Sequence, residues 1–235
     1  MNPNTTGHIS ILLIPFILLG FINKKKFIIL IWLISLFIIT IVESRSTLLA
    51  WLLCLSSYLI VLKFPKINFV FTTILVCTST LISVYAIDFA VWLLFDVLNL
   101  LGHYDTRFLY LEYNGRDVIW ESALNRFYNE PYFGLGFGGS KFEIEGHTFD
   151  THNGFLEILL RLGLIGTILF FIYSLNLSYM ISKSNLNIKP ILVVSLVAIM
   201  SLATNSATFF VFNYLFLYVN ILIYVAFIFN KRTEL

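Results

Sequence analysis

Charged residues are scarce in this sequence, and the scarcity limits what the protein can be. Asp, Glu, Lys and Arg make up 12% of the 235 residues, whereas an ordinary soluble domain has about 25%. The net charge of +2 is too small to indicate a nucleic-acid partner. The only two cysteines, Cys54 and Cys77, lie inside apolar runs, so we expect packing roles rather than a disulfide.

Several familiar motifs are also missing. The sequence has no Walker motif, no dinucleotide fingerprint, no His/Cys spacing of a zinc site and no paired acidic motif of a metal-dependent sugar transferase. We therefore expect no cofactor and no metal ion. A cleavable signal peptide is not expected either, because the apolar stretch 9–22 lacks a positive region before it and a lysine cluster follows it.

Long apolar runs dominate what is present. Hydrophobic residues make up 59% of the chain, and the mean hydropathy is +0.89. A spanning helix needs about 20 mostly apolar residues. The runs predict an all-α polytopic membrane protein with about seven transmembrane helices: His8–Ile22, Phe27–Val42, Thr47–Leu62, Ile67–Ile87, Gly154–Ile181, Pro190–Thr204 and Thr208–Phe229. The stretch Asp88–Leu101 either extends the fourth helix or lies along the interface.

The basic residues between these runs predict an orientation. Lysine or arginine follows the first, third, fifth and seventh predicted helices, at Lys24, Lys25, Lys26, Lys63, Lys66, Lys183, Lys189, Lys231 and Arg232. That side is cytoplasmic by the positive-inside rule. We expect transmembrane helices over residues 1–102, a periplasmic loop over 103–153 and further transmembrane helices over 154–235. The chain then either starts outside or is preceded by an odd number of helices.

The long outer segment, Gly102–Asn153, is the only sizeable aqueous piece that the sequence predicts. It carries eight acidic and four basic side chains. Residues Gly115–Asn129 have the pattern of a short amphipathic helix, which Pro131 ends. The glycines that follow predict a flexible turn close to the membrane: Gly134, Gly136, Gly138 and Gly139.

Three residues in outer segments could carry chemistry. Arg45 lies in a tight link between two spans, where a charge is either functional or an interfacial partner of Glu43. Arg116 lies in the first turn of the amphipathic helix, where its planar guanidinium suits a diphosphate. The simpler alternative for Arg116 is a surface ion pair with Asp117 or Glu112.

The third candidate, His152, precedes a long predicted helix. A neutral imidazole at this face can act as general base on a sugar hydroxyl. Asp150 and Glu157 are near enough in sequence to orient it, although a lone histidine is more often structural. The other histidines are weaker candidates: His147 first, then His8 and His103.

In this order and spacing, the motifs resemble the O-antigen ligase/polymerase family, and the resemblance covers nearly the whole chain. The residues that carry it are Asn2-Pro3-Asn4, Ser44-Arg45-Ser46, Gly115-Arg116, Trp120, Ala123, Phe127, Pro131, Gly134, Gly136, Thr151-His152-Asn153-Gly154, Glu157, Leu162-Gly163 and Gly166. No single motif among them is specific, whereas their order and common outer location are.

The resemblance implies a fold and a reaction. The fold is that of a GT-C-like multi-spanning glycosyltransferase of the bacterial inner membrane, with its active face periplasmic. The reaction is a metal-independent, inverting transfer from a polyprenyl-diphosphate-linked oligosaccharide to a lipid A-core, a growing polysaccharide or a protein. Arg45 and Arg116 would hold the donor diphosphate, and His152 would activate the acceptor hydroxyl.

The resemblance also has implications for partners and length. Membrane lipid is an expected partner, and the resemblance also allows other polysaccharide-assembly proteins as partners. Family members usually carry about twice as many helices, and this chain begins near their middle, so the missing helices are expected to help form the donor groove. Two alternatives stay open at this point: a transporter or flippase of the same lipid-linked glycan, and a non-catalytic membrane subunit.

Overall fold

The computed structural model is helical, with one small hairpin, and it describes residues 3–42, 45–85, 116–136, 142–144, 147–149, 151, 153–204, 217 and 220–224. Its elements are α1 (Pro3–Gly20), α2 (Lys25–Val42), α3 (Arg45–Lys63), α4 (Phe69–Tyr85), α6 (Arg116–Phe127), β1 (Phe142–Ile144), β2 (His147–Phe149), α7 (Gly154–Ser182) and α8 (Lys189–Ala203). The strands pair antiparallel, with Phe142 opposite Phe149.

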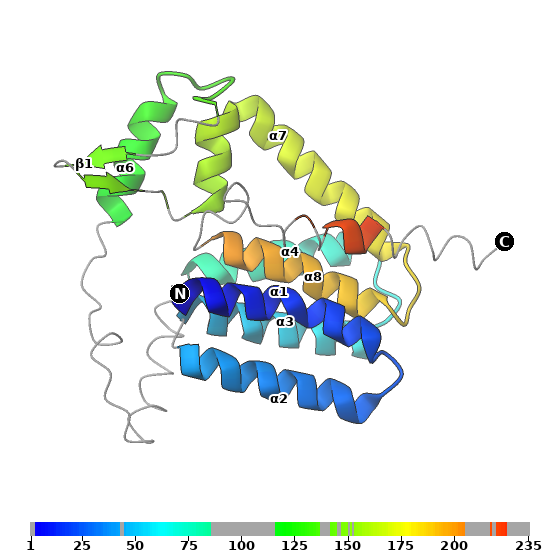
Figure 1. Ribbon diagram of the computed structural model, residues 1–235. Helices are drawn as coiled ribbons and strands as arrows, with labels where there is room; N and C mark the ends of the chain where they lie inside the picture. Colours follow the sequence, from blue (N-terminus) through cyan, green and yellow to red (C-terminus); the bar gives the residue numbers. More distant parts are fainter. Residues whose placement is uncertain are drawn as a thin grey trace.

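Helices α1, α2, α3, α4 and α8 form a bundle (Figure 1). α8 is its central helix, because it packs against α1, α3, α4 and α7 and every residue from Lys189 to Ala203 is buried. A helix that is apolar all round has no face suited to water, so neighbours must cover it on every side. Pro190 near its first turn lacks a backbone N–H that would have no helical partner there.

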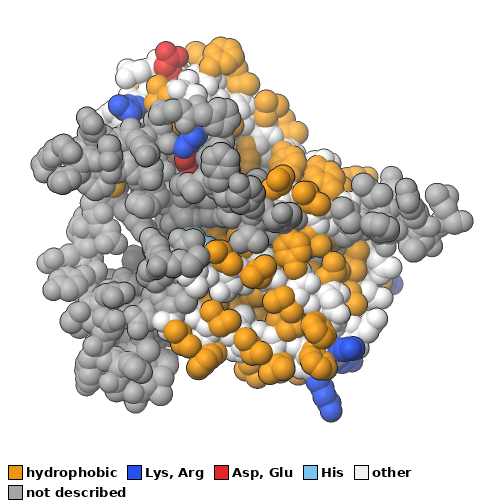
Figure 2. Space-filling view, in the orientation of Figure 1, with side chains coloured by type: hydrophobic (Ala, Val, Ile, Leu, Met, Phe, Trp, Pro, Cys, Tyr) orange, Lys and Arg blue, Asp and Glu red, His pale blue; other side chains and the backbone are white. Residues whose placement is uncertain are grey.

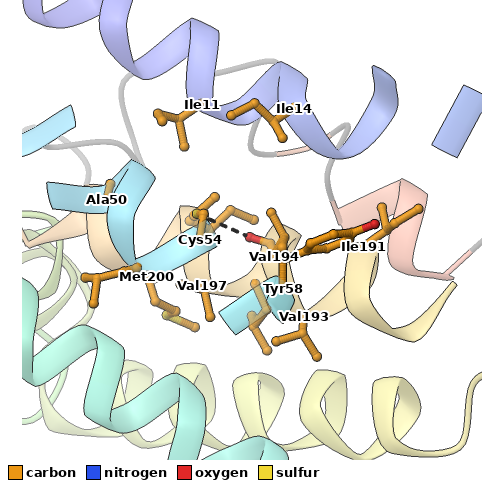
Figure 3. Close-up of a cluster of buried hydrophobic side chains, with 14 of the residues drawn as sticks. Ile11, Ile14, Ala50, Cys54, Tyr58, Ile191, Val193, Val194, Val197 and Met200 are labelled. Carbon is orange, nitrogen blue, oxygen red and sulfur yellow. Dashed lines mark hydrogen bonds between the residues drawn. The ribbon is translucent and has the colours of Figure 1, made fainter. Parts of the chain in front are cut away.

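The bundle core is made mainly of aliphatic side chains from α1, α3 and α8. Figure 3 shows Ile11 and Ile14 of α1 close to Cys54 of α3 and Val194 of α8. The Cys54 thiol points at the Val194 carbonyl at 3.9 Å, so this cysteine packs as expected. A polar contact joins α2 to α3, where the Trp51 indole N–H donates to the Ser35 hydroxyl at 2.8 Å.

The two ends of the bundle differ in charge. The connections α1–α2, α3–α4 and α7–α8 share one end (Figure 1), where the buried Lys189 ammonium lies 3.5 Å from the Ile67 carbonyl. The other end holds the starts of α1 and α3 and the ends of α4 and α8. There Ser83 and Thr204 share a hydrogen bond of 3.0 Å. The expected clustering of basic connections on one side therefore agrees with the packing of these helices.

Much of the outer surface is apolar. On α2, the side chains of Ile29, Leu33, Phe37 and Ile41 recur every fourth residue and are 59–65% exposed. Figure 2 shows apolar side chains over much of this face of the bundle. In the described part of the chain, two helices are long and apolar enough to cross a membrane, Ser46–Lys63 and Gly154–Ser182. An apolar surface of this kind suits lipid rather than water.

Most helix boundaries fall within a few residues of the predicted ones, and the fifth predicted helix is found as α7 but with a break that was not predicted. α7 breaks at Gly163, whose φ of 64° and ψ of −166° are not helical. Its first arm, residues 154–162, therefore runs in a different direction from its second arm, residues 164–182 (Figure 1). The second arm alone is about 28 Å long at roughly 1.5 Å per residue, close to a bilayer core.

Other sequence expectations meet the structure in different ways. The amphipathic helix predicted at Gly115–Asn129 is confirmed as α6, Arg116–Phe127. The β1–β2 hairpin was not expected. The stretch Asp88–Leu101 and most of the seventh predicted helix lie outside the described residues, although residues 220–224 are helical. The inside and outside assignments and the domain limits at 102 and 153 stay predictions.

Candidate functional site

Helix α6 packs against the first arm of α7. Ile119 and Ala123 of α6 and Leu160 of α7 are buried together, and α6 contacts α7 and β1. Around this centre lie partly buried side chains that include Trp120 and Leu156. The amphipathic pattern predicted Val118, Leu124 and Phe127 as the apolar face of α6, whereas the structure buries Ile119 and Ala123 against α7 and leaves Leu124 40% exposed.

The segment after α6 docks on the break in α7. The Leu135 amide donates to the Leu160 carbonyl at 2.7 Å, and the Gly136 amide donates to the Arg161 carbonyl at 3.0 Å. In return, the Leu164 amide donates to the Pro131 carbonyl at 2.9 Å. A helix break leaves backbone groups without their helical partners. Residues 131–136 supply those partners, so this part of the predicted flexible turn is instead a fixed backbone clamp.

Two glycines make the clamp sterically feasible. Gly134 has φ +72° and Gly163 has φ +64°, a region that only glycine adopts without strain. A Cβ on Gly134 would lie 2.5 Å from the Gly163 amide nitrogen, and a Cβ on Gly163 would lie 2.6 Å from the Gly134 amide nitrogen. Each glycine therefore occupies the space that a side chain on the other would need.

The backbone just before α7 is held from both sides. The Trp120 indole N–H of α6 donates to the Thr151 carbonyl at 2.9 Å. The Thr151 hydroxyl, on a side chain buried to 1% exposure, donates to the Asn153 carbonyl at 3.1 Å. The Asn153 side chain caps α7 by accepting from the Phe155 and Leu156 amides at 3.0 and 3.1 Å. These contacts fix the residues on either side of position 152.

A buried ion pair lies one turn further along α7. The Arg161 guanidinium contacts the Glu157 carboxylate at 2.5 Å, with side-chain exposures of 13% and 2%. The spacing is four residues, so the two side chains lie on the same helix face. The acidic residue also lies in the first turn of α7, where the helix dipole favours negative charge. Sequence reasoning had considered Glu157 only as a partner of His152.

An apolar cavity of about 330 Å³ lies between the two arms of α7 and α6. Phe155 and Leu156 of the first arm, Thr167 and Phe170 of the second, and Trp120 of α6 are among its lining residues. Asn153, the cap of α7, also lines it. The cavity can hold an apolar group next to the segment that precedes α7.

Two of the three candidate residues begin helices. Arg45 is the first residue of α3 and Arg116 the first residue of α6. His152 lies outside the described residues, as do Asp150 and His103, but its neighbours Thr151 and Asn153 are described. His147 belongs to β2 and pairs with Ile144, and His8 lies buried in α1.

The structure brings two of the three candidate regions together. α6, which Arg116 begins, is joined to Thr151, the residue before His152, by the Trp120 hydrogen bond. α3, which Arg45 begins, packs instead against α1, α2, α4 and α8. Arg45 starts α3 at the bundle end opposite the basic connections. Among the described residues, no group of three His, Cys, Asp or Glu side chains is placed to hold a metal ion.

Sequence reasoning missed two features of the site, and the sequence contained a signal for one of them. Gly163 interrupts an otherwise continuous apolar helix, and an isolated glycine there often has a packing reason. Trp120 was noted as part of a motif, but nothing local to its sequence indicates a partner 31 residues away. The docking of residues 131–136 on the break is a long-range pairing that periodicity does not reveal.

Comparison with known proteins gives one match. A family model described as O-antigen ligase matches residues 30–171, more than half of the chain. The matched range begins within α2, ends within α7 and contains Arg45, Arg116 and His152. No curated protein and no solved structure gave a match.

Proposed function

The chain belongs to the O-antigen ligase family, and on that basis we propose that it transfers a polyprenyl-diphosphate-linked glycan to an acceptor hydroxyl at the periplasmic face of the inner membrane. The family is membrane-associated and implies a glycosyltransferase-type enzyme. The acceptor is a lipid A-core sugar or a growing polysaccharide. The observation that carries the proposal is the match itself, because it spans all three candidate residues.

The proposed chemistry needs a base and a site for the leaving group. His152 removes the proton from the acceptor hydroxyl, whose oxygen attacks the anomeric carbon of the donor sugar. The bond from that carbon to the diphosphate oxygen breaks, and the diphosphate leaves on its polyprenyl carrier. Attack opposite the leaving group inverts the anomeric centre.

Arg45 and Arg116 are proposed to hold the diphosphate. Charge develops on the leaving diphosphate as the bond breaks, and preorganised guanidinium groups stabilise it. The position of Arg116 at the start of α6 supports this role, because α6 is hydrogen-bonded to the residue before His152. The position of Arg45 at the non-basic end of the bundle is consistent with a periplasmic site.

Substitution of the three residues tests the proposal. We expect His152→Ala to lower transfer by about 10²–10⁴-fold and Arg45→Ala or Arg116→Ala by about 10²–10³-fold. The assay uses membranes that contain the full chain, with lipid-linked glycan extracted from a strain lacking the gene as donor. Each variant is compared at equal membrane abundance.

Matched controls separate the site from general charge effects. Lys63→Ala removes a cation at the opposite end of α3 from Arg45, and Arg126→Ala removes one near the opposite end of α6 from Arg116. His147→Ala removes the rival base. Full transfer in all three site variants, or equal loss in the controls, would refute the proposal. The glycan profile of a deletion strain then identifies the class: a ligase loses long surface chains altogether, whereas a polymerase leaves single-repeat chains.

A further inference from the structure

The hydrogen bond between Trp120 and Thr151 connects α6, which begins with the proposed diphosphate ligand Arg116, to the segment of the proposed base His152. Trp120 lies one turn after Arg116 on α6, and Thr151 is the residue before His152. The indole N–H and the Thr151 carbonyl are 2.9 Å apart, well within hydrogen-bond distance. The bond joins backbone and side chain across 31 residues of sequence.

We propose that Trp120 is a positioning residue that sets the location of the general base relative to the diphosphate-binding helix. The inference rests on the proposed function and adds a residue to it. The indole ring itself is anchored by packing with Ile119, Ala123 and Leu160. The N–H that bonds the Thr151 carbonyl therefore belongs to a ring whose position is restricted by packing.

The other side of the same segment is fixed independently. The Thr151 hydroxyl bridges to the Asn153 backbone, and Asn153 caps α7. One neighbour of position 152 is therefore held by α6 and the other by its cap on α7. Catalysis depends steeply on such placement, because a displacement of about 1 Å can cost on the order of 10²-fold in rate.

The adjoining cavity supports the same placement. Trp120 and Asn153 both line the apolar cavity between α6 and the arms of α7. The two groups that fix the segment are thus also two groups that a bound molecule would touch. A change at Trp120 that keeps an aromatic side chain in the cavity wall but removes the indole N–H should affect the chemical step more than it affects binding.

Trp120→Phe makes that change. We expect kcat to fall about tenfold while the KM for the extracted lipid-linked donor stays within about twofold. Thr151→Val provides a second variant, because it removes the hydroxyl bridge to Asn153 while keeping the side-chain volume. It should produce the same split between kcat and KM.

Trp51→Phe is the matched control. It removes an indole N–H bond of 2.8 Å to Ser35 between α2 and α3, far along the chain from Trp120 and Thr151. We expect its kcat to stay within about twofold of the wild type. A kcat for Trp120→Phe and Thr151→Val no lower than that of Trp51→Phe would overturn the inference, as would a loss explained by lower membrane abundance.

A double-substitution cycle distinguishes positioning from a general loss of order. If Trp120 acts by placing the base relative to α6, its effect should be smaller in an Arg116→Lys background, because the diphosphate is already held less well. Strict additivity would contradict this. Transfer that survives His152→Ala would refute the proposed function and the inference together, whereas an inactive His152→Ala with a fully active Trp120→Phe would refute the inference alone.

Discussion

The bundle and the α6–α7 unit are held together by different kinds of contact. In the bundle of α1, α2, α3, α4 and α8, aliphatic side chains interdigitate, as they do around Cys54 and Val194 (Figure 3). In the unit formed by α6, residues 131–136 and the first arm of α7, a small apolar cluster is supplemented by backbone hydrogen bonds from residues 131–136 to α7, and a cap and an ion pair stabilise the first arm itself.

This contrast indicates which substitutions each region can tolerate. Aliphatic packing adapts to substitutions of similar volume, whereas a backbone clamp depends on conformations that only particular residues can adopt. Sites on such over-determined backbone are well suited to hold reacting groups, because their geometry is fixed before a substrate binds. The comparison predicts that matched changes in the two regions will have unequal effects on transfer.

Gly163→Ala should have the largest effect. A positive φ costs an alanine about 1–2 kcal/mol, and overpacking against the Gly134 backbone adds about 1–3 kcal/mol. We therefore expect α7 to lose its break or release residues 131–136, with a fall in stability of roughly 2–5 kcal/mol and loss of transfer. Thermal unfolding in detergent measures the first effect, and protease cleavage between α6 and β1 detects the released segment.

Two glycines provide controls for that experiment. Gly136 also has a positive φ, of +72°, but a Cβ there would lie in open space. Gly136→Ala therefore isolates the conformational cost of about 1–2 kcal/mol. Gly20, at the end of α1, has open space and no positive φ, so Gly20→Ala should have little effect. If Gly163→Ala unfolds at the same temperature as Gly20→Ala, the clamp does not contribute as described.

Arg161→Met should have the second largest effect. It removes the guanidinium that contacts the buried Glu157 carboxylate, and we expect a cost of about 2–3 kcal/mol in unfolding free energy. Replacing both residues, with Glu157→Leu and Arg161→Met together, removes the buried charge as well and should be less destabilising than Arg161→Met alone. A double variant less stable than the single one would show that the charges stabilise the unit beyond their mutual contact.

The predictability of the fold also differs between the two regions. The length and apolar composition of α3 predicted Thr47–Leu62, and the observed helix is Arg45–Lys63. Helix α8 was equally close. Such helices are specified by a continuous local property, namely apolarity over one membrane thickness. The bundle could therefore be predicted from windows of sequence without knowing which helix touches which.

The α6–α7 unit was less predictable because the contacts that determine its structure join residues far apart in the sequence. The carbonyl of Leu160 is paired with the amide of Leu135, and no window of sequence contains that relation. The hairpin was a different kind of miss. Phe142–Ile144 alternates apolar and polar residues, and only Glu145-Gly146 separates it from His147–Phe149, a spacing that fits a two-residue hairpin loop.

The candidate site shows the same division. Motif order predicted roles for Arg45, Arg116 and His152, and the first two of these begin helices. Motif order did not predict the Trp120 bond to Thr151, although Trp120 was among the residues that carried the resemblance. A resemblance to a family identifies which residues of the sequence are of interest. Explaining why a residue such as Trp120 is there requires the structure, which shows the residue that it contacts.

Asn153→Ala allows a direct comparison of the two regions, because the bundle contains a matching helix cap. Loss of a helix cap costs about 1 kcal/mol, and here it also loosens the segment next to His152. Asn68 provides the same chemistry in the bundle, because its side chain accepts from the Phe71 amide at 2.9 Å at the start of α4. We expect Asn153→Ala and Asn68→Ala to lower the unfolding free energy similarly, but only Asn153→Ala to lower transfer.

The corresponding replacements by aspartate serve as controls for both caps. Asp keeps the accepting oxygen, so Asn153→Asp and Asn68→Asp should retain most of the stability. A loss of transfer in Asn68→Ala equal to that in Asn153→Ala would mean that any weakened helix start impairs the enzyme. The contrast between the bundle and the α6–α7 unit would then not hold.

Ser83→Ala should have the smallest effect, although it removes a buried contact between two bundle helices. The Ser83 and Thr204 hydroxyls are 3.0 Å apart and join the ends of α4 and α8. Side-chain hydrogen bonds between membrane helices contribute only about 0.6 kcal/mol on average, so unfolding should shift slightly and transfer should not change. Thr78→Val is the control, since the Thr78 hydroxyl donates to the Ile74 and Leu75 carbonyls of its own helix. Because this bond lies at the same end of the bundle as Arg45, a strong loss of transfer in Ser83→Ala would instead make that end of α4 and α8 part of the site.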